Sequence, residues 1–249
     1  KIDRRKKYYL MIDTETCNGI MEEDGKLNLN YSLVYDLGMA IVDKQGTVYA
    51  QESLIIKEIY YGMADIMTSC YYKDKLPRYD IEIKQGNRKA VSLYEAREII
   101  KNLLILFDTN IVIAHNASFD NRETNNTQRY LTKSKYRYFF PYGVEIHCIW
   151  HMACQTICQK IDYQFFCAKN GYFSKNKNMT TNAETVYKYL TKNHNFEEEH
   201  TGLADVHIEL EILCECLKYH EKVNEYIYRG CYHLPQKRFK KLCEKVLTN

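Results

Sequence analysis

The feature that most constrains the fold is a short apolar run that ends in two acids. Residues 8–16 read YYLMIDTET, so Asp13 and Glu15 directly follow a segment suited to a buried strand. Side chains at positions i and i+2 of a strand point to the same face, about 6–7 Å apart. Two carboxylates held side by side repel each other, and burial strengthens that repulsion. We therefore expect a cation between them.

The pattern along the chain predicts an α/β fold, with a mixed sheet covered by helices. A tight turn at residues 44–46 makes the second and third strands an antiparallel hairpin beside the first. Ser92 begins a capping box, which marks a helix start. The expected strands are residues 7–13, 33–43, 47–56, 110–115 and 144–148. The expected helices are residues 92–106, 119–132, 149–160, 182–192 and 202–219.

No repeat or Pro/Gly-rich linker divides the chain, so we expect one domain over residues 1–249. Residues 57–91 break the strand pattern between the third strand and the first core helix. We interpret them as an irregular or partly helical insertion. Residues 220–249 are interpreted as a basic C-terminal extension.

Charge is distributed unevenly along the chain. The formal net charge is +3, with +4 on residues 1–7, +5 on residues 229–249 and −6 on the rest. Basic ends around an acidic centre suit an enzyme that attracts a polyanion and gathers carboxylates at a metal site. Solvated tails are the alternative. The candidate phosphate contacts are Lys237, Arg238, Lys240 and Lys241.

Neither a membrane protein nor a zinc protein is indicated. No run approaches the ~18–20 apolar residues of a membrane span, so we expect a soluble, cytoplasmic protein with no membrane partner. The ten cysteines are dispersed and lack the CxxC pairs of structural zinc sites. We interpret the cysteines between residues 148 and 167 as reduced, buried thiols.

Two further segments place acids at the ends of predicted elements. Asp120 ends the sequence HNASFD, just after a short apolar strand. Asp205 ends the sequence HTGLAD near the start of a helix, and His200 begins it. Asp13, Glu15, Asp120 and Asp205 are therefore candidates for one carboxylate site.

These segments resemble the motifs of the DEDDh 3′–5′ exonucleases. This DnaQ-like group of the RNase H-like superfamily includes proofreading subunits, RNase T and oligoribonuclease. Its D-x-E motif and following D-x-G turn are similar to IDTET and YDLGMAIVD, and its second and third motifs to HNASFD and HTGLAD. Each motif alone is weak, but three in order are a strong signal. Gly202 stands where the family usually has Ala, which we expect to loosen the helix start.

The resemblance implies an RNase H-like mixed β-sheet flanked by helices and a metal-dependent 3′–5′ exonuclease. Such an enzyme hydrolyses single-stranded DNA or RNA, or both, from the 3′ end and releases nucleoside 5′-monophosphates. Two divalent cations, Mg²⁺ or Mn²⁺, about 3.5–4 Å apart would support the in-line displacement. These hard ions prefer carboxylates to thiols.

The resemblance also implies a role for each site residue. Asp13 would bridge both ions, Glu15 and Asp205 would hold the ion nearer the nucleophile, and Asp120 would act on the other side. His200 would be the general base for the attacking water. Residues expected around the terminal nucleotide and its 3′-OH are Thr14, Glu15, Thr16, Asn116 and Phe119. We interpret His115, His207 and the acidic run at 197–199 as structural.

Two alternatives stay open at this point. One is a proofreading subunit that acts beside a separate polymerase or another replication protein. The other is a catalytically silent module that binds nucleic acid. The silent module is disfavoured because the chain carries all four acids and the histidine.

Overall fold

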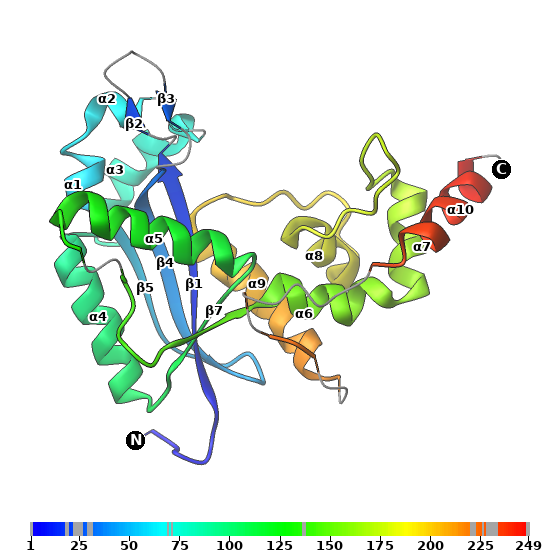
Figure 1. The fold of residues 1–249 in the computed structure, drawn as a ribbon, viewed down its shortest axis with the longest axis horizontal. Helices are drawn as coiled ribbons and strands as arrows, with labels where there is room; N and C mark the ends of the chain where they lie inside the picture. Colours follow the sequence, from blue (N-terminus) through cyan, green and yellow to red (C-terminus); the bar gives the residue numbers. More distant parts are fainter. Residues whose placement is uncertain are drawn as a thin grey trace.

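The computed structural model describes residues 2–17, 20–21, 27–28, 32–68, 70, 72–135, 138–219, 223–225, 227 and 234–247. Its main sheet has the strand order β6-β5-β4-β1-β7-β8 (Figure 1). Strand β1 is antiparallel to β4 and parallel to β7, so the predicted mixed sheet is confirmed. The strands are β1 (Tyr8–Cys17), β4 (Leu33–Asp43), β5 (Val48–Ile56), β6 (Lys89–Val91), β7 (Ile111–Ala114) and β8 (Glu145–Cys148), with β2 (Ile20–Met21) and β3 (Leu27–Asn28) paired separately.

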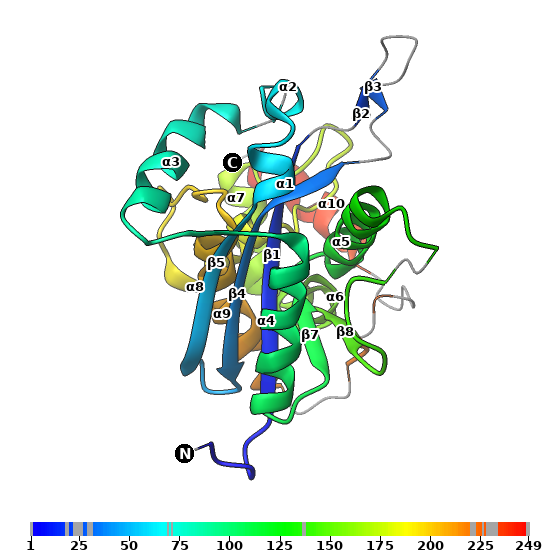
Figure 2. The ribbon, with the colours of Figure 1, turned by 90° about the vertical axis from the view of Figure 1, so that its left-hand side faces the viewer.

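Helices cover both faces of the sheet, as Figure 2 shows. One face packs against α4 and α5, and the other against a layer formed by α6 to α10. The helices are α1 (Lys57–Tyr60), α2 (Ala64–Met67), α3 (Leu76–Lys84), α4 (Leu93–Leu106), α5 (Ala117–Thr132), α6 (Ile149–Gln155), α7 (Ile161–Asn170), α8 (Ala183–Thr191), α9 (Gly202–Leu217) and α10 (Gln236–Leu247). No helix in the described ranges is long and apolar enough to cross a membrane.

The alternation of β1 decides which layer each of its side chains reaches. Leu10 and Ile12 belong to the core beneath α4 and α5, whereas Tyr9 and Met11 belong to the core beneath α9. Because successive side chains of a strand point to opposite faces, Asp13 and Glu15 point toward the α9 layer. Thr14 points toward the α5 layer.

Strand β1 is longer than predicted, because its pairing with β4 continues beyond the apolar run. Asp13 pairs with Gly38 and Glu15 with Asp36, so both acids lie within the strand. The predicted strand over residues 33–43 is confirmed, because β4 has the same bounds. Asp36 and Gly38 of the D-x-G motif lie inside β4, which pairs with β1 on one side and β5 on the other.

Helix α9 approaches β4 so closely that only glycines fit at the contact. A Cβ on Gly202 would lie 2.5 Å from the backbone N of Gly38, and a Cβ on Gly38 would lie 2.0 Å from the carbonyl carbon of Gly202. Backbone clashes of this size force the chain to shift. Gly202 therefore permits the start of α9 to pack beside Asp13. Our expectation that this glycine loosens the helix start stays a prediction.

The insertion at 57–91 is partly helical, as predicted, and contains α1, α2, a 3₁₀ turn at Lys73–Lys75 and α3. It ends in β6, an edge strand parallel to β5 that is not among the predicted strands. The buried Arg88 forms an ion pair of 2.8 Å with Asp36 of β4. The Tyr79 hydroxyl donates to the same carboxylate at 2.9 Å. The insertion is thus fixed to the central sheet.

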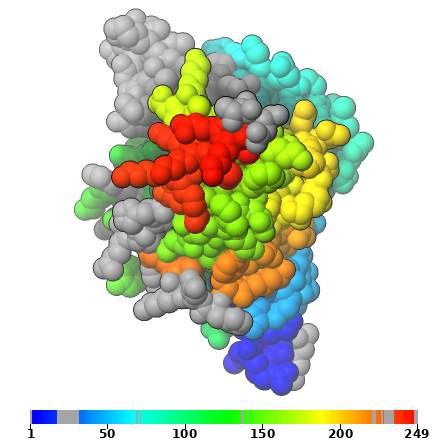
Figure 3. Space-filling view, turned by 90° about the vertical axis from the view of Figure 1, so that its right-hand side faces the viewer, coloured from blue at the N-terminus to red at the C-terminus, as the bar shows by residue number. Residues whose placement is uncertain are grey.

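The predicted capping box at Ser92 is confirmed at the start of α4. The helix predicted for 149–160 breaks at Thr156, whose φ of −118° and ψ of −84° are not helical, and a 3₁₀ turn follows at Ile157–Gln159. Helix α7 is not among the predicted helices. Of the basic extension, the residues outside the described ranges are 220–222, 226, 228–233 and 248–249. Helix α10 packs on α7 (Figure 3).

Candidate active site

The fold brings the four predicted carboxylates together at one edge of the central strands. Asp13 and Glu15 come from β1, Asp120 from the first turn of α5 and Asp205 from the first turn of α9. The charges of the other three each contribute to the pKa of Asp13, as expected for close neighbours. Segments separated by more than 100 residues in sequence therefore build one acidic centre.

Burial is the main cause of the raised pKa values of the carboxyl groups at this centre. Loss of hydration raises the pKa of Asp13 well above its usual range, and neighbouring carboxylates raise it further. Burial and the charge of Asp205 raise the pKa of Glu15 to about 9. Burial also raises the pKa values of Asp120 and Asp205 to about 7 each. The site thus favours positive charge, either as protons or as a cation.

The residues present fit a divalent cation. Glu15, His200 and Asp205 each offer a ligand atom, and these atoms all lie within 4.8 Å of one another. Oδ1 of Asp205 is buried and has no hydrogen-bond partner. Hard carboxylate oxygens are the donors that Mg²⁺ and Mn²⁺ prefer. A second group of suitable residues in the described ranges is Glu184, Glu198 and His200, and neither group contains a cysteine.

His200 lies just before α9 in an uncommon backbone conformation, with a φ of +49°. Against the larger effect of burial, the backbone of His200 acts to lower the pKa of Asp205. Its imidazole is 32% exposed, and Nδ1 lies 3.7 Å from Oε2 of Glu198. Burial and the charge of Lys75 lower the pKa of His200, which favours a neutral ring able to accept a proton.

Several residues at the site were not predicted. Glu198 is not merely part of an acidic helix start, since its side chain is only 15% exposed and lies beside His200. Burial raises the pKa of Glu198 to about 7. Glu209 lies one turn after Asp205 in α9, and its charge raises the pKa of Asp13 more than any other neighbouring charge does. The sequence could have indicated Glu209, because residues four apart on a helix lie on the same face, and Glu209 follows Asp205 by four positions.

Two of the predicted nucleotide contacts have structural contacts of their own. The Thr14 hydroxyl donates to Oδ1 of Asp120 at 2.8 Å, so it orients a carboxylate. The carbonyl of Asn116 accepts from the Phe119 N–H at 2.8 Å at the start of α5. Asn116 is exposed, whereas Phe119 and Thr16 are half-buried. Nucleotide binding by these residues stays a prediction.

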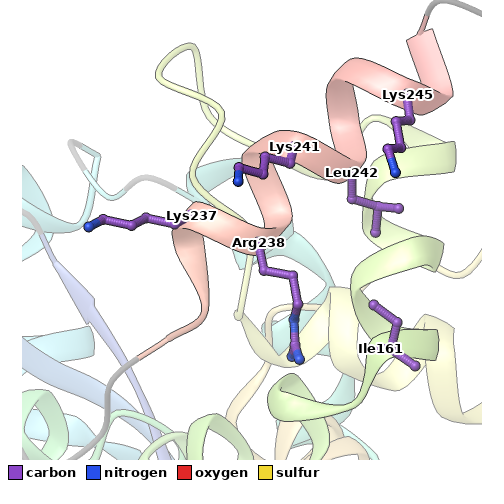
Figure 4. Close-up of a pocket in the computed structure, with 6 residues that line it drawn as sticks. All are labelled: Ile161, Lys237, Arg238, Lys241, Leu242 and Lys245. Atoms are coloured by element: carbon purple, nitrogen blue, oxygen red, sulfur yellow. The ribbon is translucent and has the colours of Figure 1, made fainter.

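The predicted phosphate contacts lie on α10, whose bases border a surface groove of about 480 Å³ (Figure 4). Lys237 and Lys241 line this groove, and Lys240 is exposed. Arg238 also lines the groove, but its side chain has partners within the protein. Its guanidinium donates to Oε1 of Gln164 and to the carbonyl of Gln159, both at 2.9 Å, and so anchors α10 to the α7 region.

No family model matches the chain, and no curated protein sequence matches it. One similar solved structure is a 3′-exonuclease that recognises the histone mRNA stem-loop with specificity for the 3′ end. It matches with a TM-score of 0.50 and 14% identity, over 88% of this chain and 85% of that chain. The chain shares its fold with this 3′-exonuclease.

Two other solved structures are similar. The nuclease domain of 3′hExo, a DEDDh family member bound to rAMP, matches with a TM-score of 0.48 and 12% identity over 89% of this chain and 98% of that domain. The zinc-bound E. coli ExoI–ssDNA complex matches with a TM-score of 0.46 and 14% identity over 98% of this chain. The chain spans only 43% of ExoI.

The metal-free protein should lose stability as the pH rises from about 5 to 9. In this window the native carboxylates, whose pKa values are raised to about 7 to 9, hold protons that the unfolded chain has released. The native state thus binds more protons, and the free energy of unfolding falls with pH. We expect Tm in EDTA to drop by roughly 5–10 °C, the equivalent of a few kcal/mol.

Differential scanning calorimetry in EDTA and in Mn²⁺ measures this effect. Mn²⁺ should remove most of the drop, and Glu15→Gln should reduce it. The exposed carboxylate variant Asp65→Asn is the control and should behave like the original protein. A Tm in EDTA that does not fall across this range contradicts the electrostatic description of the site.

Proposed function

We propose that this protein is a metal-dependent 3′–5′ exonuclease that releases nucleoside 5′-monophosphates from single-stranded DNA, RNA or both. The observation that carries the proposal is the convergence of Asp13, Glu15, Asp120, Asp205 and His200 in one acidic centre, in which Asp120 and Asp205 are buried and the other three are half-buried. The fold, shared with a 3′-exonuclease at a TM-score of 0.50, supports it.

Each residue has a role in this proposal. Asp13, Glu15, Asp120 and Asp205 would hold two Mg²⁺ or Mn²⁺ ions, which supply charge neutralisation and a more acidic water. Thr14 fixes the orientation of Asp120 through its 2.8 Å hydrogen bond. His200 accepts the proton of the attacking water, and Glu198 beside its Nδ1 stabilises the resulting imidazolium.

The reaction balances without a further reactant. The water oxygen forms a bond to the phosphorus of the last phosphodiester, and the bond from phosphorus to the preceding O3′ breaks. The terminal nucleotide leaves as a 5′-monophosphate. The departing O3′ takes up a proton from the solvent and becomes the 3′-hydroxyl of the shortened strand. His200 releases to the solvent the proton that it accepted from the water.

The alternatives receive less support. A catalytically silent module would not need to keep four carboxylates in a centre that raises their pKa values. No comparison supports a polymerase partner, and the proposal includes none. The proposed partner is the 3′ end of a single strand.

The decisive measurement is release of mononucleotides from 5′-fluorescent single strands of DNA and RNA in Mg²⁺ or Mn²⁺. The protein should shorten the strands from the 3′ end, and a 3′-phosphate should slow it. Asp13→Asn should abolish hydrolysis with the fold intact, because the raised pKa favours a neutral Asp13 in the metal-free protein, which the neutral amide resembles in charge and size. Hydrolysis that is unaffected by Asp13→Asn would exclude this site as the catalytic centre.

His200→Ala should reduce kcat about 10²–10⁴-fold, the usual contribution of general acid–base catalysis. Mn²⁺ affinity, measured by calorimetry, should change little, because the carboxylates supply the ligands. His207→Ala is a matched control, since His207 is exposed on α9 and should be replaceable. If His200→Ala weakens Mn²⁺ binding as much as Asp205→Asn does, His200 is a metal ligand and not the base.

The lysines on α10 should contribute to phosphate binding. Replacing both Lys237 and Lys241 with Ala should reduce the salt slope of single-strand binding, d log K/d log[salt], by about 1.4 in magnitude, or about 0.7 per lost contact. Fluorescence anisotropy over a range of salt concentrations measures it. The control pair Lys44→Ala and Lys101→Ala should leave the slope unchanged. Equal slopes for both pairs would mean that the α10 lysines form only a solvated face.

A further inference from the structure

The segment from Tyr72 to Arg88 holds the loop that carries the proposed general base. This segment belongs to the insertion, and the loop comprises residues 198–202 before and at the start of α9. The two are separated by more than 100 residues in sequence. Their contacts involve a ring stack, ion pairs and a buried carboxylate, and each is described below.

Tyr72 makes the most specific contact. Its ring stacks on the imidazole of His200, with centroids 4.4 Å apart and an interplanar angle of 13°. Glu198 lies at another side of the same imidazole, 3.7 Å from Nδ1. The ring is therefore bounded on one face by Tyr72 and at one edge by a carboxylate, which restricts its rotation.

The neighbouring residue Glu199 is held by two bases of the insertion. The ammonium of Lys75 donates to the Glu199 carbonyl and also lies over the Tyr72 ring, 4.5 Å from its centroid. Arg78 forms an ion pair of 2.9 Å with the Glu199 carboxylate. Lys75 thus links the ring that stacks on His200 to the backbone just before His200.

The residue at the far end of the loop is held through the sheet. The N–H of Gly202 donates to Oδ2 of Asp36 at 3.1 Å. Arg88 donates to the same oxygen of Asp36 at 2.8 Å. Arg88 also donates to Oε2 of Glu82, within the insertion, at 2.5 Å. The insertion therefore fixes the loop on both sides of His200.

His200 needs these contacts to hold its backbone and its ring, because it lies outside α9 and the hydrogen bonds of that helix do not fix it. The residue precedes the helix and has a φ of +49°, a conformation that costs a non-glycine residue free energy and persists only when surrounding contacts maintain it. A general base must also be placed accurately, since a shift of about 1 Å can cost about 10²-fold in rate.

We propose that Tyr72 is a positioning residue for His200, held in place by Lys75 and the rest of the insertion. The proposal rests on the proposed function, because it assigns Tyr72 a part in the same hydrolysis. Tyr72 acts through the imidazole and makes no bond to the reacting atoms. The 57–91 insertion is therefore part of the catalytic apparatus.

A double-mutant cycle tests the assignment. Tyr72→Leu should lower kcat roughly 10–100-fold with KM unchanged, and Tyr72→Phe, which keeps the stacking ring, should remain within about threefold of the original protein. In a His200→Ala background, Tyr72→Leu should cause no further loss, because the two residues act as a unit. A matched control is Tyr94→Leu, which replaces a tyrosine that is 69% exposed on α4.

The opposite outcome is equally clear. If Tyr72→Leu raises KM, or lowers the rate equally with and without His200, Tyr72 contacts the nucleic acid and the assignment is wrong. That result would leave the proposed nuclease function standing.

A measurement that needs no activity separates the two proposals. In NMR spectra of the metal-free protein, the Tyr72 ring should shift the His200 ring protons upfield. Tyr72→Leu should remove that shift, whereas Tyr72→Phe and Tyr94→Leu should keep it. Retention of the shift in Tyr72→Leu would overturn the stacking, whether or not the protein hydrolyses nucleic acid.

Discussion

The loss of hydration at neighbouring carboxylates, together with their mutual repulsion, is the constraint on which the rest of this structure depends. Asp13 and Glu15 lie two residues apart on one face of β1, and each has a raised pKa because burial removes its hydration. Such a pair requires a rigid support, since a mobile strand would turn the acids to solvent. Strand β1 is held between β4 and β7 at the centre of the sheet, which supplies that support.

The alternation of side chains along β1 then divides the site between the helix layers on the two faces of the sheet. Asp13 and Glu15 face α9, which contributes Asp205 one turn before Glu209. Thr14, which points to the opposite face, donates to Asp120 at the start of α5. A single strand therefore faces acids from helices on both sides of the sheet and orients Asp120 directly. Gly38 and Gly202 complete this arrangement by allowing α9 to touch the backbone of β4.

The structural features that the sequence predicts correctly are those that depend on residues close together in the chain. The hairpin of β4 and β5 and the capping box at Ser92 both follow from local spacing. The four acids and His200 were singled out by the resemblance of their motifs to an exonuclease family, and their catalytic roles stay a prediction. The end of β1 was placed too early because Thr14 to Thr16 are polar, although their pairing with β4 continues. Tyr72 and Glu198 carry no such pattern, since their places depend on tertiary contacts alone.

The contacts that hold the His200 loop differ in kind from those that hold the acids. The acids are fixed by a sheet and two helices, whereas Tyr72, Lys75 and Arg78 are partly or largely exposed. Exposed ion pairs of this type add about 0–1 kcal/mol each. These contacts therefore add little to the free energy of unfolding. Their main effect is to fix the position of the His200 imidazole, on which the rate of hydrolysis depends. A base carried outside a helix, on a residue with positive φ, depends on such contacts more than the carboxylates do.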